Sequence, residues 1–314
     1  MAKLDPTAKM YVERIHQLPA LHKMEPQAVR DLYAQMPPVE MELAPLATIE
    51  ERLIPVGQDA RIKIRIYTPE GQGPFPLFVY YHGGGWVIGD LETVDASCRM
   101  LANQTGRIVV SVDYRLAPEH KFPVPLADSY SALKWVSENA TAINGNASKL
   151  VVGGDSAGGN LSAVVSQLAK EQGGPAIAAQ VLVYPCTDMR FDSASYMDFQ
   201  EGFGLNRDLM IWFSNHYINH AYDKGNPYVS PLVANDLSNL PPAMVITAEF
   251  DVLRDEGIAY AERLKKAGVM VETYCEQGLV HGYFTNMAVF PEHIKETISR
   301  IGNFLMKIDQ TVTS

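Results

Sequence analysis

The chain has 314 residues, of which 47% are hydrophobic and 20% charged, enough apolar material for one large core or a core with a subdomain. A formal net charge of −10 argues against binding to nucleic acid or to an anionic membrane. The stretch MAKLDPTAKMYVERIHQL lacks the apolar region of a secretory signal, and no apolar run approaches the roughly 18 residues of a membrane span. The three cysteines have no metal-type spacing and favour a reducing compartment, so we expect a cytoplasmic protein.

Residues 1–45 carry helical patterns and no strand pattern. A first helix is expected around residues 9–15, where apolar positions recur near the helical period. A second helix is expected to begin at Glu25-Pro26, to run through Met36 and to stop at Pro37-Pro38. The first strand is therefore expected only from residue 47 onward.

From residue 47 the pattern becomes that of strands. ATIEERLIPV (47–56) and ARIKIRIYTP (60–69) alternate apolar and polar residues, as half-exposed antiparallel strands do. Apolar strand-like runs then alternate with helix-length segments. Repeated βα units of this kind predict a mostly parallel, twisted sheet with helices on both faces, an α/β fold. The further strands are expected at 76–82, 107–114, 149–154, 178–185, 242–249 and 269–277, and the helices at 94–106, 124–140, 156–172, 255–268 and 292–308.

Residues 187–225 interrupt this alternation. They are too long for a simple loop and include an aromatic helix-like stretch at 206–222, which indicates a subdomain or lid. In open parallel sheets, ligands bind beyond the carboxyl ends of the strands. The residues that directly follow each strand are therefore the candidates for function.

One serine stands among four glycines at the end of the strand 149–154, in GGDSAGGN. The spacing Gly-x-Ser-x-Gly between a strand and a helix is typical of a nucleophile elbow, which exposes its serine at the top of the sheet. A glycine-rich turn with an incidental serine would have the same sequence, so a second signal is needed before Ser156 can be interpreted as a nucleophile. A phosphate-binding loop is excluded because Asn160 follows the glycines, where Lys with Ser or Thr is needed.

The second signal is His82-Gly83-Gly84-Gly85-Trp86, which follows the strand 76–82. Three glycines at a strand end expose consecutive backbone N–H groups that can bind an anion. A dinucleotide fingerprint would need glycine at position 88, which is Ile88. The HGGG form is associated with the oxyanion holes of esterases, so the two signals together predict acyl transfer.

A nucleophilic serine needs a histidine base, which follows it in the chain order of this fold. Of the eight histidines, four follow Ser156. His281 comes directly after the strand 269–277, at the expected edge of the sheet, and is the candidate base. His216 and His220 share helical i,i+4 spacing but lack the Glu of a zinc motif, so we expect surface or packing roles for them. His293 is expected to be exposed on the last helix.

The base needs an orienting carboxylate, and Asp251 is the candidate. It follows the strand 242–249, one βα unit before His281, so the two turns are expected side by side. The alternative role for Asp251 is to cap the next helix, although Asp255 or Glu256 could compensate that helix dipole. Glu249 is the nearest rival for the acid, but it falls within or at the end of the strand.

These residues resemble the bacterial branch of the hormone-sensitive-lipase family of carboxylesterases, which has the α/β-hydrolase fold. The resemblance covers essentially the whole chain. It differs from the usual family pattern at Val252, where proline commonly follows the acid. The motifs that carry it, in family order, are HGGGW at 82–86, DYRLAPEHKFP at 113–123, GDSAGGN at 154–160, YPCTD at 184–188, EFDVLRDEG at 249–257 and HGYF at 281–284.

The resemblance implies that Ser156 is the nucleophile, Asp251 the acid and His281 the base. It implies that the N–H groups of Gly84, Gly85 and Ala157 form the oxyanion hole, with Gly83 supporting the loop. It also implies a helical cap built from residues 1–45 and 187–225 over a catalytic domain of residues 46–186 and 226–314. The charges of DYRLAPE, Asp113, Arg115 and Glu119, are interpreted as a structural ion network beneath the HGGG loop.

The expected activity is hydrolysis of small carboxylic esters with short-to-medium acyl chains through an acyl-enzyme, without a metal or organic cofactor. We expect Trp86, Met210 and Phe213 to line the substrate pocket, the last two from a helical face of Leu209, Trp212, Phe213 and Tyr217 with Met210 on its flank. We expect a monomer or homodimer. The rival functions are an amidase or peptidase with the same three residues, and a ligand-binding receptor on the same fold.

Overall fold

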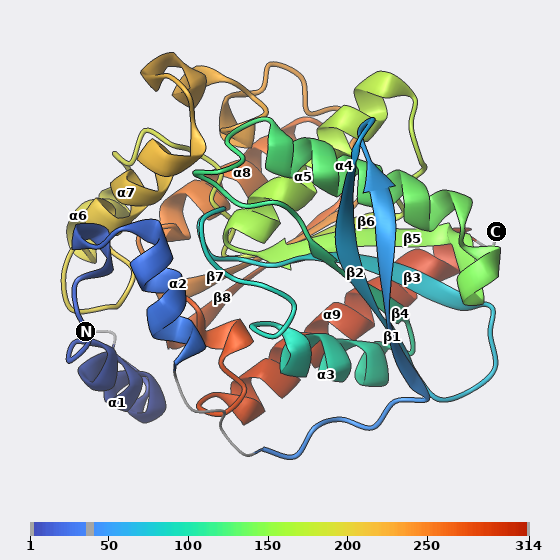
Figure 1. Cartoon of the computed structure of the whole chain (residues 1–314), viewed down its shortest axis with the longest axis horizontal. Coiled ribbons are helices and arrows are strands. Elements are labelled where there is room, and N and C mark those ends of the chain that lie inside the picture. Colours follow the sequence, from blue (N-terminus) through green and yellow to red (C-terminus); the bar gives the residue numbers. More distant parts are fainter. Residues whose placement is uncertain (1–2, 36–40, 313–314) are drawn as a thin grey trace.

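The computed structural model describes residues 3–35 and 41–312 and contains one eight-stranded sheet in the order β1-β2-β4-β3-β5-β6-β7-β8 (Figure 1). β1 and β2 pair antiparallel with each other, and β2 pairs antiparallel with β4, whereas all other neighbours are parallel. The mostly parallel sheet predicted from the sequence is confirmed. The strands are β1 (Thr48–Val56), β2 (Ala60–Thr68), β3 (Phe75–Tyr81), β4 (Ile108–Asp113), β5 (Gly145–Asp155), β6 (Ala179–Val183), β7 (Ala243–Phe250) and β8 (Val271–Val280).

Helices cover both faces of the sheet, which explains why the central strands β3, β4 and β6 are buried along nearly their whole length. α3 (Asp95–Thr105) packs against α9 (Pro291–Val312) on one face. α4 (Val124–Glu138), α5 (Ala157–Gln172) and α8 (Arg254–Lys266) cover the other face (Figure 1). No helix of the described residues has both the length and the apolar character needed to cross a bilayer.

The segments without strand pattern form helices outside the sheet. The N-terminal segment contains α1 (Pro6–Ile15), the short helix η1 (Leu21–Lys23) and α2 (Pro26–Ala34). The segment 187–225 contains α6 (Ala194–Asp198), α7 (Arg207–Tyr217) and η3 (Ala221–Gly225). α7 contacts η1, and Figure 1 shows α1 and α2 on the same side of the molecule as α6 and α7. Three further short helices are η2 (Thr141–Ile143), η4 (Pro231–Val233) and η5 (Tyr283–Thr285).

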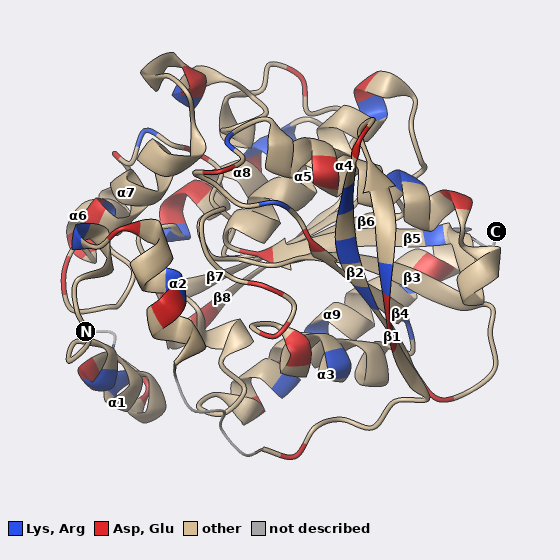
Figure 2. Cartoon of the chain, viewed as in Figure 1, with Lys and Arg blue, Asp and Glu red and all other residues tan. Residues whose placement is uncertain are grey.

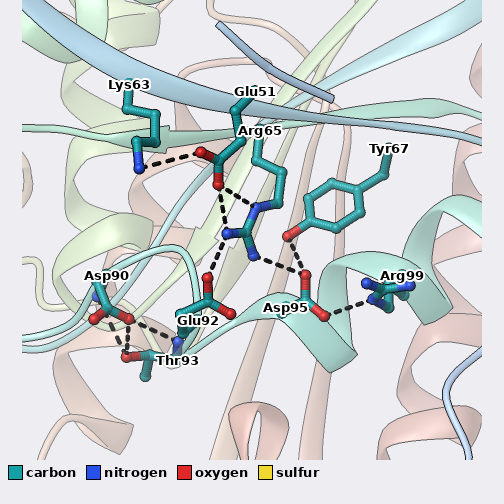
Figure 3. Close-up of polar contacts among 9 residues, drawn as sticks. All are labelled: Glu51, Lys63, Arg65, Tyr67, Asp90, Glu92, Thr93, Asp95 and Arg99. Carbon is teal, nitrogen blue, oxygen red and sulfur yellow. Dashed lines mark hydrogen bonds and ion pairs between the residues drawn. The ribbon is translucent and has the colours of Figure 1, made fainter. Parts of the chain in front are cut away.

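A cluster of charged side chains joins the antiparallel edge of the sheet to α3. Figure 2 shows basic residues along β2, where every second side chain shares a face. Arg65 of β2 donates to Glu51 of β1 at 2.6 Å and to Asp95 of α3 at 3.0 Å, and it also pairs with Glu92 (Figure 3). The Arg65 side chain is only 12% exposed, so these contacts fix the segment that leads into α3.

The bounds of several elements differ from the sequence prediction. β5 begins at Gly145 instead of residue 149, because its first residues pair with β3 across a register shift. β8 continues past residue 277 to Val280. α7 ends at Tyr217, so the expected helix 206–222 is too long. α2 is described to Ala34, and the expected end of that helix at Met36 and Pro37-Pro38 lies outside the described residues.

Candidate active site

Ser156 lies in a sharp turn between β5 and α5. Its φ of +55° is in the left-handed region, which side chains other than glycine rarely adopt. The turn needs its glycines because it packs directly against the end of β3. A Cβ atom on Gly154 would come 2.1 Å from the carbonyl oxygen of Tyr81, and one on Gly158 would come 1.8 Å from the same atom. The glycines therefore allow a close approach of two strand ends that any side chain would prevent.

His281 and Asp251 extend from the ends of the two neighbouring strands, β8 and β7. The Nε2 atom of His281 is 3.0 Å from the Oγ atom of Ser156, and its Nδ1 atom is 2.7 Å from Oδ2 of Asp251. Because a carboxylate only accepts hydrogen bonds, Nδ1 carries the proton and Nε2 is free to accept one from the serine. The structure thus brings together the three residues that the sequence singled out.

The surroundings of this group hold each member in place. The Asp251 side chain is fully buried, and its Oδ1 atom accepts a hydrogen bond from the Leu253 N–H at 2.9 Å. The ring of Tyr184 lies 4.5 Å from the His281 ring. The His281 side chain keeps 12% of its surface exposed. Asp251 therefore orients the imidazole from the buried side, while the opposite side faces the serine.

The segment from His82 to Trp86, here called the HGGGW loop, follows β3 beside the serine turn. Gly84, Gly85 and Trp86 all have positive φ, of +105°, +59° and +62°. Among the described residues, the N–H groups of Gly84, Gly85 and Ala157 donate no hydrogen bond to another protein group. The first turn of α5 adds the positive end of its dipole at Ala157. Backbone N–H groups left without a protein acceptor can bind an anion.

Gly83 differs from Gly84 and Gly85, because its N–H donates to Oδ1 of Asp155 at 3.0 Å. The same carboxylate oxygen accepts from the Tyr80 hydroxyl at 2.7 Å. Burial raises the pKa of Asp155, and the Tyr80 hydrogen bond opposes that shift. Asp155 thus ties the serine turn to the HGGGW loop. The sequence interpretation missed it, although an acidic residue at the end of a buried strand was a signal.

His82 fixes the other side of the HGGGW loop. Its ring stacks on Tyr114 at 4.3 Å, and its Nδ1 atom is 2.7 Å from the carbonyl oxygen of Gly83. Burial lowers the pKa of His82 to about 4, so the ring is neutral near pH 7 and Nδ1–H donates to that carbonyl. His82 is a buried support of the loop.

Three residues expected in the substrate pocket are all buried. Trp86 stacks on Tyr217 of α7 at 4.3 Å. Phe213 lies so close to the HGGGW loop that a Cβ atom on Gly85 would come 2.2 Å from its ring. Met210 is 3% exposed on the same helix. α7 therefore packs directly over the loop.

The buried face of α7 is not quite the one expected. It consists of Met210, Phe213, Ser214 and Tyr217, whereas Leu209 and Trp212 are only partly buried on its flank. The difference arises from Ser214, whose hydroxyl donates to the sulfur of Met189 at 3.7 Å and so can be buried despite its polarity.

A family model described as the α/β hydrolase fold matches residues 78–285 of the chain, from β3 to the turn beyond His281. The chain belongs to this family. The hydrolase is 40% identical over 299 residues to carboxylesterase NlhH of Mycobacterium tuberculosis, a match that covers 94% of this chain and 93% of the relative. It is 39% identical over 252 residues to an arylesterase of Saccharolobus solfataricus, which covers 80% of this chain and 81% of that protein.

Solved structures agree with the sequence relatives. The hydrolase superimposes on a fungal esterase from Rhizomucor miehei with a TM-score of 0.94 and 38% sequence identity, covering 99% of this chain and 98% of the other. The predicted α/β-hydrolase fold and the resemblance to the hormone-sensitive-lipase family are confirmed. The hydrolase is a carboxylesterase.

The expectation that the charges of DYRLAPE form one ion network is wrong. Arg115 pairs with Asp128 of α4 at 2.7 Å, and Glu119 pairs with Arg30 of α2 at 2.8 Å, so Asp113, Arg115 and Glu119 do not form one network. Asp128 lies on the helix that directly follows the motif, whereas Arg30 lies 89 residues before Glu119 in the sequence. The Arg30 hydrogen bond also lowers the pKa of Glu119 to about 2.

The remaining histidines have packing or surface positions. His216 is in the last turn of α7, but His220 lies beyond the helix end, so the two do not share a helical face. His220 is exposed, and its ring stacks on Tyr222. His293 was expected to be exposed, yet it is half-buried, with Nε2 3.6 Å from Oδ2 of Asp5. A link to the N-terminus is not visible in the sequence of the last helix.

Proposed function

We propose that this carboxylesterase cleaves its substrates with Ser156 as nucleophile, His281 as base and Asp251 as orienting acid. The observation that carries the proposal is the continuous hydrogen-bonded path from Ser156 through His281 to Asp251. The distance from Ser156 Oγ to His281 Nε2 is 3.0 Å, and that from His281 Nδ1 to Asp251 Oδ2 is 2.7 Å. The path ends on a carboxylate in a buried position, and it starts at a serine held at the N-terminus of a helix. This arrangement is the one required to activate a hydroxyl group at neutral pH.

The reaction would proceed in two steps. Ser156 Oγ attacks the ester carbonyl carbon while its proton moves to His281 Nε2, and the leaving alcohol takes that proton as the carbon–oxygen bond breaks. Water then attacks the acyl-enzyme and gives a proton to Nε2, which returns it to the serine as the carboxylic acid leaves. Asp251 keeps His281 in the required tautomer and stabilises its protonated form.

The negative charge that develops on the carbonyl oxygen would be bound by the N–H groups of Gly84, Gly85 and Ala157. Removal of one such donor typically costs about 100- to 1,000-fold in rate. Gly83 has a supporting role in this proposal, since its N–H is already engaged by Asp155. The chemistry needs no proton donor or acceptor beyond His281.

We further propose that residues 1–45 and 187–225 act as a cap over a catalytic domain of residues 46–186 and 226–314. Trp86, Met210 and Phe213 would line the acyl pocket beneath it. The support is the packing of α7 against the HGGGW loop, where Phe213 lies against Gly85. A pocket closed in this way favours short-to-medium acyl chains.

Labelling of the serine tests the assignment. An organophosphate such as diethyl p-nitrophenyl phosphate should modify Ser156 alone, as located by peptide mass spectrometry. In Asp251→Asn, the labelling rate and kcat for p-nitrophenyl butyrate should both fall by about 10,000-fold, because the amide no longer selects the required histidine tautomer.

Asp255→Asn is the matched control. Asp255 lies about one helical turn after Asp251 in the sequence. Its carboxylate accepts the Ser195 N–H at 2.8 Å and pairs with Arg254 at 2.8 Å. We expect this variant to keep most of the labelling rate. Modification of another serine, or a reversal of the two aspartate variants, would contradict the proposal. Faster turnover of p-nitroanilides than of the matching esters would favour the amidase instead.

A further inference from the structure

The parallel pair β7–β8 changes register just before the two residues that meet as Asp251 and His281. Ala248 pairs with Glu276, but the next paired residues are Phe250 and Val280. One residue of β7, Glu249, thus spans the same stretch as three residues of β8, 277–279. The extra pair of residues in β8 forms a bulge.

This bulge brings the base level with the acid. Asp251 directly follows Phe250, and His281 directly follows Val280, so the two side chains start from equivalent positions on adjacent strands. Without the slip, Phe250 would lie opposite Gly278, and His281 would lie two residues farther along the sheet edge, a displacement of about 6.6 Å. Because the slip is an even number of residues, it also keeps side chains of β8 on their original faces.

The side chain of Glu249 fills the bulge. Its Oε2 atom accepts the backbone N–H of Gly278 at 2.7 Å, in the middle of the three residues of β8 that lie opposite Glu249. The carbonyl oxygen of Glu249 accepts from Arg254 Nη1 at 3.2 Å, which anchors the residue toward α8. A carboxylate on one strand therefore binds the looped backbone of the other.

The bulge is also held from its outer side. The carbonyl oxygen of Gly278 accepts the Asp5 N–H at 3.0 Å, and Asp5 caps α1. Gly278 has a φ of +74°, and a Cβ atom there would come 2.9 Å from the Asp5 nitrogen. Both peptide groups of this glycine are thus fixed, one by Glu249 and one by Asp5, three residues before His281.

We propose that Glu249 is a positioning residue, whose hydrogen bond to Gly278 sets the bulge that places His281 within reach of both Asp251 and Ser156. This inference rests on the proposed roles of those three residues. Among the described residues, Glu249 has no hydrogen bond to the His281 imidazole. It acts through the backbone that carries the base, and an error of about 1 Å in such placement can cost about 100-fold in rate.

The test compares three variants on p-nitrophenyl butyrate, with active sites counted by complete titration with an organophosphate. Glu249→Leu removes the acceptor at similar size, and we expect kcat per titrated site to fall by about 30- to 100-fold while KM changes by less than about twofold. Glu249→Gln keeps an acceptor oxygen and should retain more than half of kcat. Glu272→Gln is the control, since this half-buried carboxylate of β8 binds Lys307 at 2.8 Å, away from the bulge, and should leave kcat unchanged.

A wild-type kcat per titrated site in Glu249→Leu, even with a lower melting temperature, would reduce Glu249 to a stabilising residue and overturn the inference. Equal losses in the Leu and Gln variants would overturn the hydrogen-bond role. Ser156→Ala and His281→Ala separate this failure from that of the proposed function. If both alanine variants are inactive and Glu249→Leu is normal, only the inference fails; if either alanine variant keeps full activity, the assigned site is wrong.

Discussion

Tyr81 restricts which residues the serine turn can contain, because its carbonyl oxygen leaves no room for a Cβ atom at Gly154 or Gly158. This explains why the residues of the site could be located from the sequence. Because the backbone contact requires glycine at these positions, the sequence shows a Gly-x-Ser-x-Gly pattern around Ser156. Asp251 and His281 can be recognised because each directly follows a strand. Asp155 left no such spacing, since its partners, Tyr80 and Gly83, are supplied by another strand.

His82 makes stability depend on pH. Its folded-state pKa of about 4 lies below the ordinary value of about 6.5, so between these values the unfolded chain binds a proton that the folded protein does not. Lowering the pH through this window therefore favours unfolding, by about 3 kcal/mol once pH 4 is reached. We expect His82→Asn, which keeps a donor near the Nδ1 position and does not titrate, to lack this contribution.

Urea unfolding at pH 7 and pH 4 checks this prediction. The stability advantage of wild type over His82→Asn should shrink by about 3 kcal/mol between the two values. Groups that titrate equally in both proteins do not contribute, because only the difference in unfolding free energy between wild type and variant is compared at the two pH values. An advantage that stays constant with pH would mean that folding does not lower the pKa of His82.

At the scale of elements, periodicity predicted the existence of every strand and the main helices, but not their ends. α7 stops at Tyr217 although the helical pattern continues, because Phe122 N–H binds the Tyr217 carbonyl oxygen at 2.8 Å and draws the chain away. The bulge in β8 was also missed. Its local sign is Gly278, since an isolated glycine within a strand can mark a bulge, but the glutamate that binds this glycine lies on the neighbouring strand.

The buried face of α7 predicts how acyl length affects turnover. Each methylene group that the pocket can bury contributes about 0.8 kcal/mol, and chains beyond its depth gain nothing further. We expect kcat/KM for p-nitrophenyl esters to rise with chain length, to peak at a short-to-medium chain and then to fall. Met210→Ala or Phe213→Ala should move the peak to a longer chain, because the cavity deepens.

Ile211→Ala is the control for this helix, since Ile211 is only partly buried beside the face that packs on the HGGGW loop. It removes similar volume and should leave the peak where it is. A peak that responds equally to Ile211→Ala and Phe213→Ala would show that α7 affects activity only through its stability.

On the scale of the whole molecule, the N-terminal segment is docked at two distant places. Arg30 donates from Nε to the Val87 carbonyl oxygen at 2.9 Å and from Nη2 to that of Ala117 at 2.7 Å, and it pairs with Glu119. Asp5 binds the bulge of β8. Helical patterns predicted the helices of this segment but not these contacts, since each joins residues with no spacing rule between them.

Arg30→Met should loosen this docking without unfolding the protein. The variant loses charge-assisted hydrogen bonds, and local opening of residues 3–35 should rise by about tenfold. Limited proteolysis with sites mapped by mass spectrometry would show faster cleavage there. Because the folded-state pKa of Glu119 is about 2, below its ordinary value, wild-type protection should be the same at pH 5.5 and pH 7 and be lost only as the pH falls toward that value.

Asp31→Asn serves as the control, because it only neutralises an exposed carboxylate that accepts a hydrogen bond from Gln27 on the same helix. Its cleavage rate should match that of wild type. Equal cleavage of Arg30→Met and Asp31→Asn would mean that apolar packing alone holds α2.

The hydrogen bond between Asp5 and Gly278 also has a consequence for the order of events during synthesis. Asp5 leaves the ribosome about 270 residues before its partner, which at about 5–20 residues per second is a wait on the order of 15 to 50 seconds. Through that interval α1 lacks its contact with β8. The serine turn can form early on β5, but the backbone that carries His281 is completed last. On the proposed assignment, a nascent chain carries its nucleophile well before it has a base to activate it, so the hydrolase would stay inert until almost the whole chain has emerged.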